Sequence, residues 1–169
     1  MDSASGVLWK SNIPPANFRI VYDESKCWWC RSCELVCSLK HEGKCSPSLS
    51  RIRISLDLFQ AKAEAGVCRQ CISPECFFAC PVPGAMKVHP ETGARLIDRV
   101  LCIGCGACTR ACPFNEEGTI IGHKSRSTME EGKAPWVYFR CDLCDGHPAC
   151  VETCPTGALQ LQKLKSRGD

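Results

Sequence analysis

Short stretches of alternating polar and apolar residues run along the chain, and they predict strands rather than long helices. Residues 51–59, Arg-Ile-Arg-Ile-Ser-Leu-Asp-Leu-Phe, alternate at the period of a half-exposed strand. Residues 85–89 and 94–97 flank a Pro-Glu-Thr-Gly turn, which is typical of a β-hairpin. Apolar runs predict two further strands, at 18–22 and 136–139, and residues 118–129 predict another strand pair.

Helical and irregular segments are predicted between these strands and at both ends. Residues 34–41 favour a short helix, and residues 61–65 favour a helical turn. Residues 1–17 lack periodicity and contain two adjacent prolines, so we expect an extended N-terminal arm. The polar stretch 162–169 is expected to fray.

The composition is typical of a cysteine-rich metal-binding protein. The 169 residues suit one domain or two small ones, and 17 of them are cysteine. The first residues do not have the pattern of a secretory leader, and no apolar run approaches the roughly 20 residues that span a bilayer. We therefore expect a cytoplasmic protein without a membrane contact. In that compartment cysteine-rich proteins bind metal more often than they form disulfides.

Sixteen of the cysteines form four quartets. The first and third quartets have the spacing C-x2-C-x2-C-x3-C, which is typical of [4Fe–4S] sites, and the second and fourth have a wider middle gap. A proline follows the last cysteine of every quartet except the first. The quartets are Cys27, Cys30, Cys33 and Cys37; Cys68, Cys71, Cys76 and Cys80; Cys102, Cys105, Cys108 and Cys112; and Cys141, Cys144, Cys150 and Cys154.

This spacing has a chemical reason. Three cysteines two residues apart let one tight loop wrap a corner of the cluster, while the fourth cysteine reaches the neighbouring cluster, as in two-cluster ferredoxins. A zinc site would use cysteine pairs with long spacers, and a disulfide scaffold would need a secreted chain, so iron–sulfur ligation is the preferred interpretation. No catalytic residue is predicted, because no Ser/His/Asp set, phosphate loop or paired carboxylate stands out.

The quartet order, the Cys-Pro-Val-Pro-Gly-Ala stretch at 80–85 and the Cys-Asp-Leu-Cys stretch at 141–144 resemble a known family. They are similar to the four-cluster, polyferredoxin-type electron-transfer subunits of molybdenum and tungsten oxidoreductases, over about residues 18–161. The chain looks most like the small iron–sulfur subunit of multi-subunit tungsten aldehyde oxidoreductase, followed by the small subunit of aromatic-acyl-CoA reductase complexes. The chain departs from the family pattern in two places: Ser38 replaces the proline after the first quartet, and Pro113-Phe114-Asn115 replaces the Pro-x-Gly-Ala turn after the third.

The resemblance implies that the first quartet pairs with the fourth and the second with the third. Spacing alone leaves open a pairing of the first quartet with the second and the third with the fourth. The four ligand sets implied by the resemblance are Cys27, Cys30, Cys33 and Cys154 for cluster 1; Cys68, Cys71, Cys76 and Cys112 for cluster 2; Cys102, Cys105, Cys108 and Cys80 for cluster 3; and Cys141, Cys144, Cys150 and Cys37 for cluster 4.

We expect an α+β fold of two pseudo-symmetric ferredoxin-like modules, each with two [4Fe–4S] clusters, short hairpins and short helices. Residues 18–66 and 119–169 would form an outer module, and residues 67–118 an inner module, behind the arm at 1–17. The formal charge of +3 would become about −5 with four clusters bound, and no basic stripe is visible. Nucleic-acid binding is therefore not expected.

The expected function is one-electron transfer along four [4Fe–4S] clusters. The family resemblance implies a catalytic partner subunit with a tungsten or molybdenum pterin, and a subunit with FAD or a soluble redox acceptor. A free polyferredoxin carrier is the alternative. The two ends of such a row differ, so a head-to-tail contact between copies could extend into a filament.

Four residues outside the quartets invite a functional interpretation but favour a plain one. Cys45 is a spare thiol once the other cysteines form complete sets. His147 is expected in a surface loop, because the fourth quartet already has four thiols. Asp23 and Asp98 are expected to shape the turns before their quartets.

Overall fold

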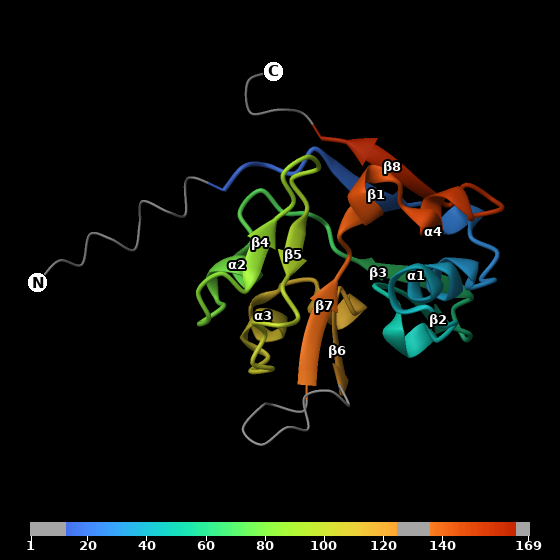
Figure 1. The fold of residues 1–169 in the computed structure, drawn as a ribbon. Coiled ribbons are helices and arrows are strands. Elements are labelled where there is room, and N and C mark those ends of the chain that lie inside the picture. The colour runs from blue at the N-terminus through green and yellow to red at the C-terminus, as the bar shows by residue number, and fades with distance from the viewer. Residues whose placement is uncertain (1–12, 125–135, 165–169) are drawn as a thin grey trace, which may run out of the picture.

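The structure is a computed structural model, and it describes residues 13–124 and 136–164. Within these ranges the chain forms short helices and two-stranded antiparallel sheets (Figure 1). The helices are α1 (Ser32–Glu42), α2 (Glu75–Phe78), α3 (Ala107–Ala111) and α4 (Ala149–Glu152). The strands are β1 (Phe18–Tyr22), β2 (Ile52–Asp57), β3 (Lys62–Val67), β4 (Met86–Val88), β5 (Arg95–Ile97), β6 (Ile120–Lys124), β7 (Trp136–Arg140) and β8 (Leu159–Lys163).

The two ends of the described chain are joined by a sheet. Strand β1 pairs with β8 from Phe18 opposite Lys163 to Tyr22 opposite Leu159. Ile20 and Leu159 are buried in this sheet, and helices α1 and α4 pack together beside it (Figure 1). Segments more than 100 residues apart in the sequence therefore form one body, because each sheet strand needs a partner to satisfy its backbone groups.

Helix α1 carries two ligand candidates on its buried face. It starts after Arg31, which has a left-handed backbone (φ 58°), and ends at Gly43, whose N–H donates to the Leu39 carbonyl. Cys33 and Cys37 are four residues apart, so their side chains lie on the same side of the helix, and both are buried.

The middle of the chain forms a second group of elements. Strands β4 and β5 make a hairpin, and helices α2 and α3 pack against each other on the same side of the molecule (Figure 1). Strands β6 and β7 pair across the undescribed residues 125–135, and β7 lies between the two groups (Figure 1). Ile120 and Tyr138 of this hairpin pack on the apolar cluster around Cys76 and Cys108.

The strand predictions at 18–22, 51–59 and 136–139 are confirmed by β1, β2 and β7, and the predicted hairpin is confirmed by β4 and β5. The helix predicted at 34–41 is confirmed by α1. The α+β class with short hairpins and helices is also confirmed. The module boundaries stay a prediction.

The helical turn predicted at residues 61–65 is wrong. Strand β3 occupies this segment and pairs with β2 in register, from Asp57 opposite Lys62 to Ile52 opposite Val67. Ala63 is buried between the exposed residues Lys62 and Glu64, as expected when side chains alternate between the two faces of a strand. Long-range pairing with burial of one face outweighs the local helix preference of alanine and lysine.

Two further predictions need correction. The strand pair expected within 118–129 supplies only β6, whose partner is the more distant β7, and residues 125–129 lie outside the described residues. The fraying expected for 162–169 is wrong for Gln162 and Lys163, because both belong to β8; residues 165–169 lie outside the described part.

The described end of the N-terminal arm packs on the β4–β5 turn. Ala16 is buried, and the Asn17 N–H donates to the Thr92 carbonyl at 2.8 Å. Gly93 (φ 67°) lies against this segment so closely that an added Cβ would be 2.5 Å from the Pro15 carbonyl oxygen. The arm is thus part of the folded body from residue 15 onward.

Candidate metal centres

Four cysteines line one pocket, whose walls come from α2, β5 and β7. They are Cys68, Cys71, Cys76 and Cys112. Cys68 and Cys76 are buried, and the other two thiols are partly exposed. Two arginines, Arg95 and Arg140, line the same pocket.

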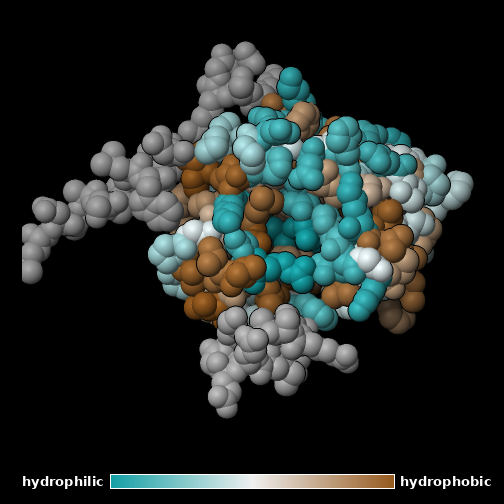
Figure 2. Space-filling view, in the orientation of Figure 1, coloured by the Kyte–Doolittle hydropathy of each residue, from teal (hydrophilic) through white to brown (hydrophobic). Residues whose placement is uncertain are grey.

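Four other cysteines line a second pocket on the far side of Met86. They are Cys80, Cys102, Cys105 and Cys108. The backbone before α3 turns tightly through Gly106 (φ 69°), which brings Cys105 and Cys108 to the same wall. Cys105 is exposed, so this pocket lies near the surface. Apolar residues gather on this α2–α3 side of the molecule in Figure 2.

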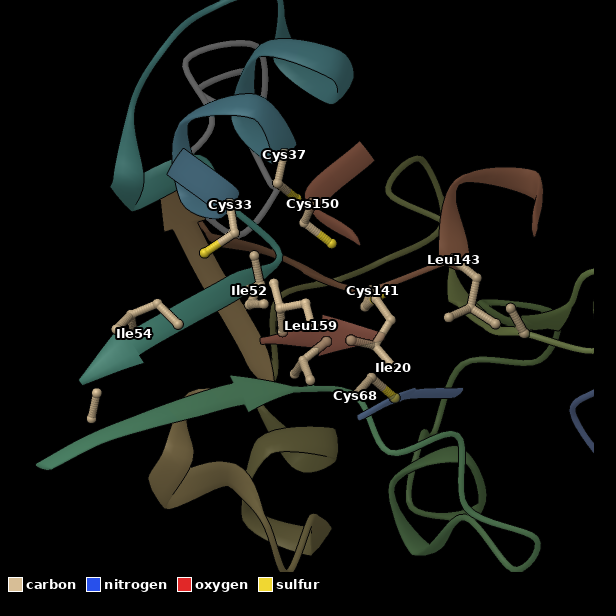
Figure 3. Close-up of a cluster of buried hydrophobic side chains, with 13 residues drawn as sticks. Ile20, Cys33, Cys37, Ile52, Ile54, Cys68, Cys141, Leu143, Cys150 and Leu159 are labelled. Carbon is tan, nitrogen blue, oxygen red and sulfur yellow. The ribbon is translucent and has the colours of Figure 1, made fainter. Parts of the chain in front are cut away.

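The remaining eight quartet cysteines belong to the segments around α1 and α4. Figure 3 shows Cys33 and Cys37 on α1 beside Cys150 of α4. Burial raises the pKa of the Cys150 thiol, and the nearby Cys37 and Cys144 thiols raise it further. Cys154 packs on the same apolar core.

The first quartet contains both buried and exposed thiols. Burial raises the pKa of the Cys33 thiol to about 12, with Glu34 and then Cys30 and Cys27 adding to the shift. Cys30 is exposed. Helix α1 of the first quartet packs against helix α4 of the fourth. Helix α2 of the second quartet packs against helix α3 of the third.

The Cys76 and Cys112 thiols of the first pocket influence each other's ionisation. The interaction with Cys112, followed by burial, raises the pKa of the Cys76 thiol, and the interaction with Cys76 lowers the pKa of the Cys112 thiol. Ionisation of one thiol therefore disfavours ionisation of the other. A bound cation that needs both thiolates would displace the second proton, as metal ligation does generally.

Backbone N–H groups point at several sulfur atoms. The Trp29 N–H donates to Cys27 Sγ at 3.4 Å, and the Arg51 N–H donates to Cys37 Sγ at 3.3 Å. At Cys154 burial raises the pKa, but hydrogen bonds from the Leu159 and Thr156 backbone outweigh it and lower the pKa. Such donors stabilise thiolate charge and tune a bound cluster.

Two buried arginines show whether the charge of the first pocket suits an anionic group. Arg95 is fully buried and Arg140 is 2% exposed, and the Nε atom of each has no hydrogen-bond partner among the described residues. Buried charge is costly unless an opposite charge compensates it. Four thiolates around an iron–sulfur cluster carry net negative charge, so the residues of this pocket fit a [4Fe–4S] cluster.

Several buried polar residues around the cysteines were missed by the sequence analysis. Gln70 is 1% exposed; its Nε2 donates to the Cys141 carbonyl at 3.0 Å, and its Oε1 accepts from the Arg95 N–H at 2.8 Å. Glu34 is fully buried and accepts from the Ile54 N–H at 3.0 Å. A polar residue inside or beside a quartet was the available signal, but its partner lies on another segment.

A second missed group surrounds Cys144. His41 Nε2 lies 3.4 Å from Cys144 Sγ and 3.5 Å from Asp142 Oδ1. Arg51 forms an ion pair with the same Asp142 carboxylate. Burial lowers the pKa of His41 and so favours its neutral form.

Asp23, Asp98 and His147 take the plain roles predicted for them, and the role of Cys45 stays a prediction. Asp23 Oδ1 accepts from the Ser25 N–H, and Asp98 Oδ1 accepts from the Val100 N–H. His147 is exposed in a loop. Cys45 is exposed and lines neither cysteine pocket.

Comparison with known proteins shows clear relatives. Residues 94–155 match the family described as 4Fe-4S dicluster domain. The "Aliphatic sulfonate oxidoreductase, polyferredoxin-like subunit" of Pyrococcus furiosus is 42% identical over 145 residues, which cover 86% of this chain and 76% of the relative. Electron transport protein HydN of Escherichia coli is 33% identical over 83% of this chain and 85% of its own length.

Among solved structures, a chain of the active site complex BamBC of benzoyl coenzyme A reductase with benzoyl-CoA aligns with 87% of this chain. The alignment covers 80% of that chain, with 25% identity and a TM-score of 0.44. In the described part of this chain, each helix is too short or too polar to cross a bilayer.

Proposed function

Because this chain belongs to the polyferredoxin-like family of 4Fe-4S electron-transfer proteins, we propose that it binds four [4Fe–4S] clusters and carries single electrons along them within an oxidoreductase complex. The observation that supports this most strongly is the grouping of the cysteines. Eight of them line two pockets in sets of four. Two buried arginines, Arg95 and Arg140, line one of these pockets, and their Nε atoms have no hydrogen-bond partner among the described residues.

Each proposed cluster takes three cysteines from one quartet and the fourth from the paired quartet. The packing of α1 on α4 and of α2 on α3 supports the pairing of the first quartet with the fourth and the second with the third. The proposed ligands are Cys27, Cys30, Cys33 and Cys154; Cys141, Cys144, Cys150 and Cys37; Cys68, Cys71, Cys76 and Cys112; and Cys102, Cys105, Cys108 and Cys80.

The same contacts support an order for the row. Cys33 and Cys37 share a helix face, so the first two sets are adjacent. Cys141 and Cys68 belong to one buried core, which links the second set to the third (Figure 3). Cys76 and Cys108 belong to another core, which links the third set to the fourth. The exposed thiols of the quartets, Cys30 and Cys105, belong to the two end sets, where electrons would enter and leave.

The protein positions the thiols, supplies charge around them and excludes water from the space between them. When bound, the clusters supply one-electron redox chemistry. The helices hold the thiols in sets, N–H donors at the sulfur atoms stabilise negative charge, and apolar side chains such as Ile20 and Leu159 exclude water between the sets. The chain itself then needs no catalytic residue.

We propose a catalytic partner with a tungsten or molybdenum pterin, and a subunit with FAD or a soluble acceptor at the other end. The sequence resemblance favours an aldehyde as the substrate of that partner. The name of the Pyrococcus relative favours an aliphatic sulfonate as the second candidate. Anaerobic co-purification, metal and flavin analysis of the complex, and assays with both substrate classes distinguish them. Purification as an active lone carrier would contradict the complex.

Iron and sulfide analysis with low-temperature EPR tests the cluster number. We expect about sixteen irons per chain after anaerobic purification. Zinc without sulfide, or iron well below four clusters, would contradict the proposal.

Paired cysteine substitutions test the ligand sets. Cys33→Ala and Cys154→Ala are each expected to remove one cluster, and the double variant is expected to remove the same single cluster. Cys33→Ala with Cys80→Ala is expected to remove two. If Cys33 and Cys80 instead behave as one set, the pairing of the first quartet with the second is correct.

A further inference from the structure

Arg140 is a buried cation that lines the first cysteine pocket and contacts a residue of the second. Its side chain is 2% exposed, and it comes from the last residue of β7, directly before the fourth quartet. One guanidinium nitrogen lies 2.9 Å from Cys76 Sγ, in the first pocket. The other terminal nitrogen lies 3.5 Å from Met86 Sδ, and Met86 lines the second pocket.

No carboxylate among the described residues forms an ion pair with Arg140. Its Nε is buried without a hydrogen-bond partner. Arg95 is the second buried guanidinium in this pocket, but it donates to the backbone carbonyls of Gly93 and Cys71. Among the described residues, the side-chain partners of Arg140 are therefore sulfur atoms, and a guanidinium group is a cation.

The reach of this charge follows from its contacts. The nitrogen beside Cys76 Sγ lies in the pocket of Cys68, Cys71, Cys76 and Cys112, and the nitrogen beside Met86 Sδ approaches the pocket of the third quartet. The charge is therefore near both pockets, and its direct contact with a thiol is in the one that contains Cys76.

We propose that Arg140 sets the electron affinity of one half of the row: it raises the reduction potential of the cluster held by Cys68, Cys71, Cys76 and Cys112 and, to a smaller extent, that of the neighbour held by Cys80, Cys102, Cys105 and Cys108. The proposal rests on the proposed function. Reduction adds one electron to an already anionic site, so a fixed cation in a poorly solvated pocket stabilises the reduced form more than the oxidised form. No proton needs to move with that electron.

The physical role differs from that of a ligand or a packing residue. Arg140 touches a sulfur atom but gives no bond to iron, and its effect depends on its charge. Met86 would still fill the space next to a neutral side chain of similar length. Potential, rather than iron content, is therefore the property that separates an electrostatic role from a structural one.

EPR-monitored redox titration of the anaerobically purified full chain tests the proposal. Three variants are compared with wild type: Arg140→Met removes the charge, Arg140→Lys keeps it, and Arg19→Met removes a guanidinium that lies near the surface with a 2.8 Å hydrogen bond to Gln162. Iron and sulfide are counted in every sample before titration.

We expect Arg140→Met to make one cluster about tenfold or more harder to reduce, which is about 59 mV for one electron, and a second cluster less so. The other two clusters keep their potentials. Arg140→Lys recovers most of the shift, and Arg19→Met changes no potential.

Three outcomes would overturn the role of Arg140: unchanged potentials in Arg140→Met, an equal shift of all four clusters, or a shift in Arg140→Lys as large as that in Arg140→Met. Loss of a cluster in both Arg140 variants would also overturn it, since the residue would then be structural. Wild-type protein without iron and sulfide would instead refute the proposed function, which keeps the two failures distinct.

Discussion

At the scale of single residues, the cysteines depend on neighbours that are not cysteines. Gln70 connects the second quartet to the fourth through one side chain, and Glu34 holds α1 to the backbone of β2. The cysteines and the turn-forming aspartates were predictable, because their roles follow from spacing and from contacts two residues away. Gln70 and Arg140 were not, because their partners come from segments 71 and 64 residues distant.

Gln70→Leu is expected to loosen the contact between the quartets. It leaves the Cys141 carbonyl and the Arg95 N–H buried without the partners they have now, at about 1–3 kcal/mol each. Cluster bleaching in denaturant should be faster than in wild type. Gln60→Leu, at an exposed position, is the matched control, and equal bleaching rates in the two variants would contradict the prediction.

Asp98→Asn is expected to lower stability in a pH-dependent way. A hydrogen bond from Lys87, followed by one from the Val100 N–H, lowers the pKa of the Asp98 carboxyl. A depressed folded pKa means that the carboxylate stabilises the fold above its unfolded pKa, and that this contribution is lost as the pH falls through the folded value. The difference from wild type should be largest near pH 7 and shrink on acidification.

Cluster bleaching in urea across a pH series measures that difference. Glu64→Gln, a charge change at an exposed residue of β3, serves as the control and should show little effect at any pH. A difference between Asp98→Asn and wild type that stays constant on acidification would count against the carboxylate as its cause.

At the scale of elements, the reliable predictions were those in which one segment carried its own pairing signal. The hairpin of β4 and β5 has both strands and its turn within twelve residues, so the sequence predicted it. Strand β3 was missed because its alanines favour helix locally and only pairing with β2 makes them a strand. The pairing of β1 with β8 has no local signal at all.

The N-terminal arm gives a prediction at this scale. Gly93→Ala and Gly43→Ala both place a side chain on a left-handed backbone, at φ 67° and 65°, with a similar local cost of about 1–2 kcal/mol. Only at Gly93 would the new Cβ meet another segment, 2.5 Å from the Pro15 carbonyl oxygen. Gly93→Ala should therefore lose more stability in denaturant and expose the arm to protease.

Gly43→Ala is the matched control, since nothing lies within 4 Å of its added Cβ. Equal stability and equal protease sensitivity in the two variants would mean that the arm does not depend on its contact with Gly93.

At the scale of the whole molecule, the apolar core forms two clusters, and buried cysteines belong to both. The larger buried cluster contains five buried cysteines next to residues such as Ile52, Leu143 and Leu159 (Figure 3). The sheets are all two-stranded in the described residues, and such pairs are marginal by themselves. Cluster binding should therefore supply much of the folding free energy.

Removal of iron by a chelator under anaerobic conditions is expected to unfold the chain cooperatively. The thiols of one set would then be buried without metal, in pockets with buried guanidinium groups and no compensating anion. Circular dichroism during chelation measures the change, and buffer without chelator is the control. Near-native circular dichroism after complete iron loss would contradict the expectation.

The sequence by itself determined the chemistry: sixteen cysteines at ferredoxin spacing predict iron–sulfur ligation, because three thiols in one tight loop need no distant contact to form a binding corner. Only the tertiary structure decided which helices pack together, which quartet thiols lie at the surface, and which buried cation faces the sulfur atoms. Those features depend on contacts between segments far apart in the chain. Spacing encodes local geometry, and the charge that surrounds a site comes from the fold.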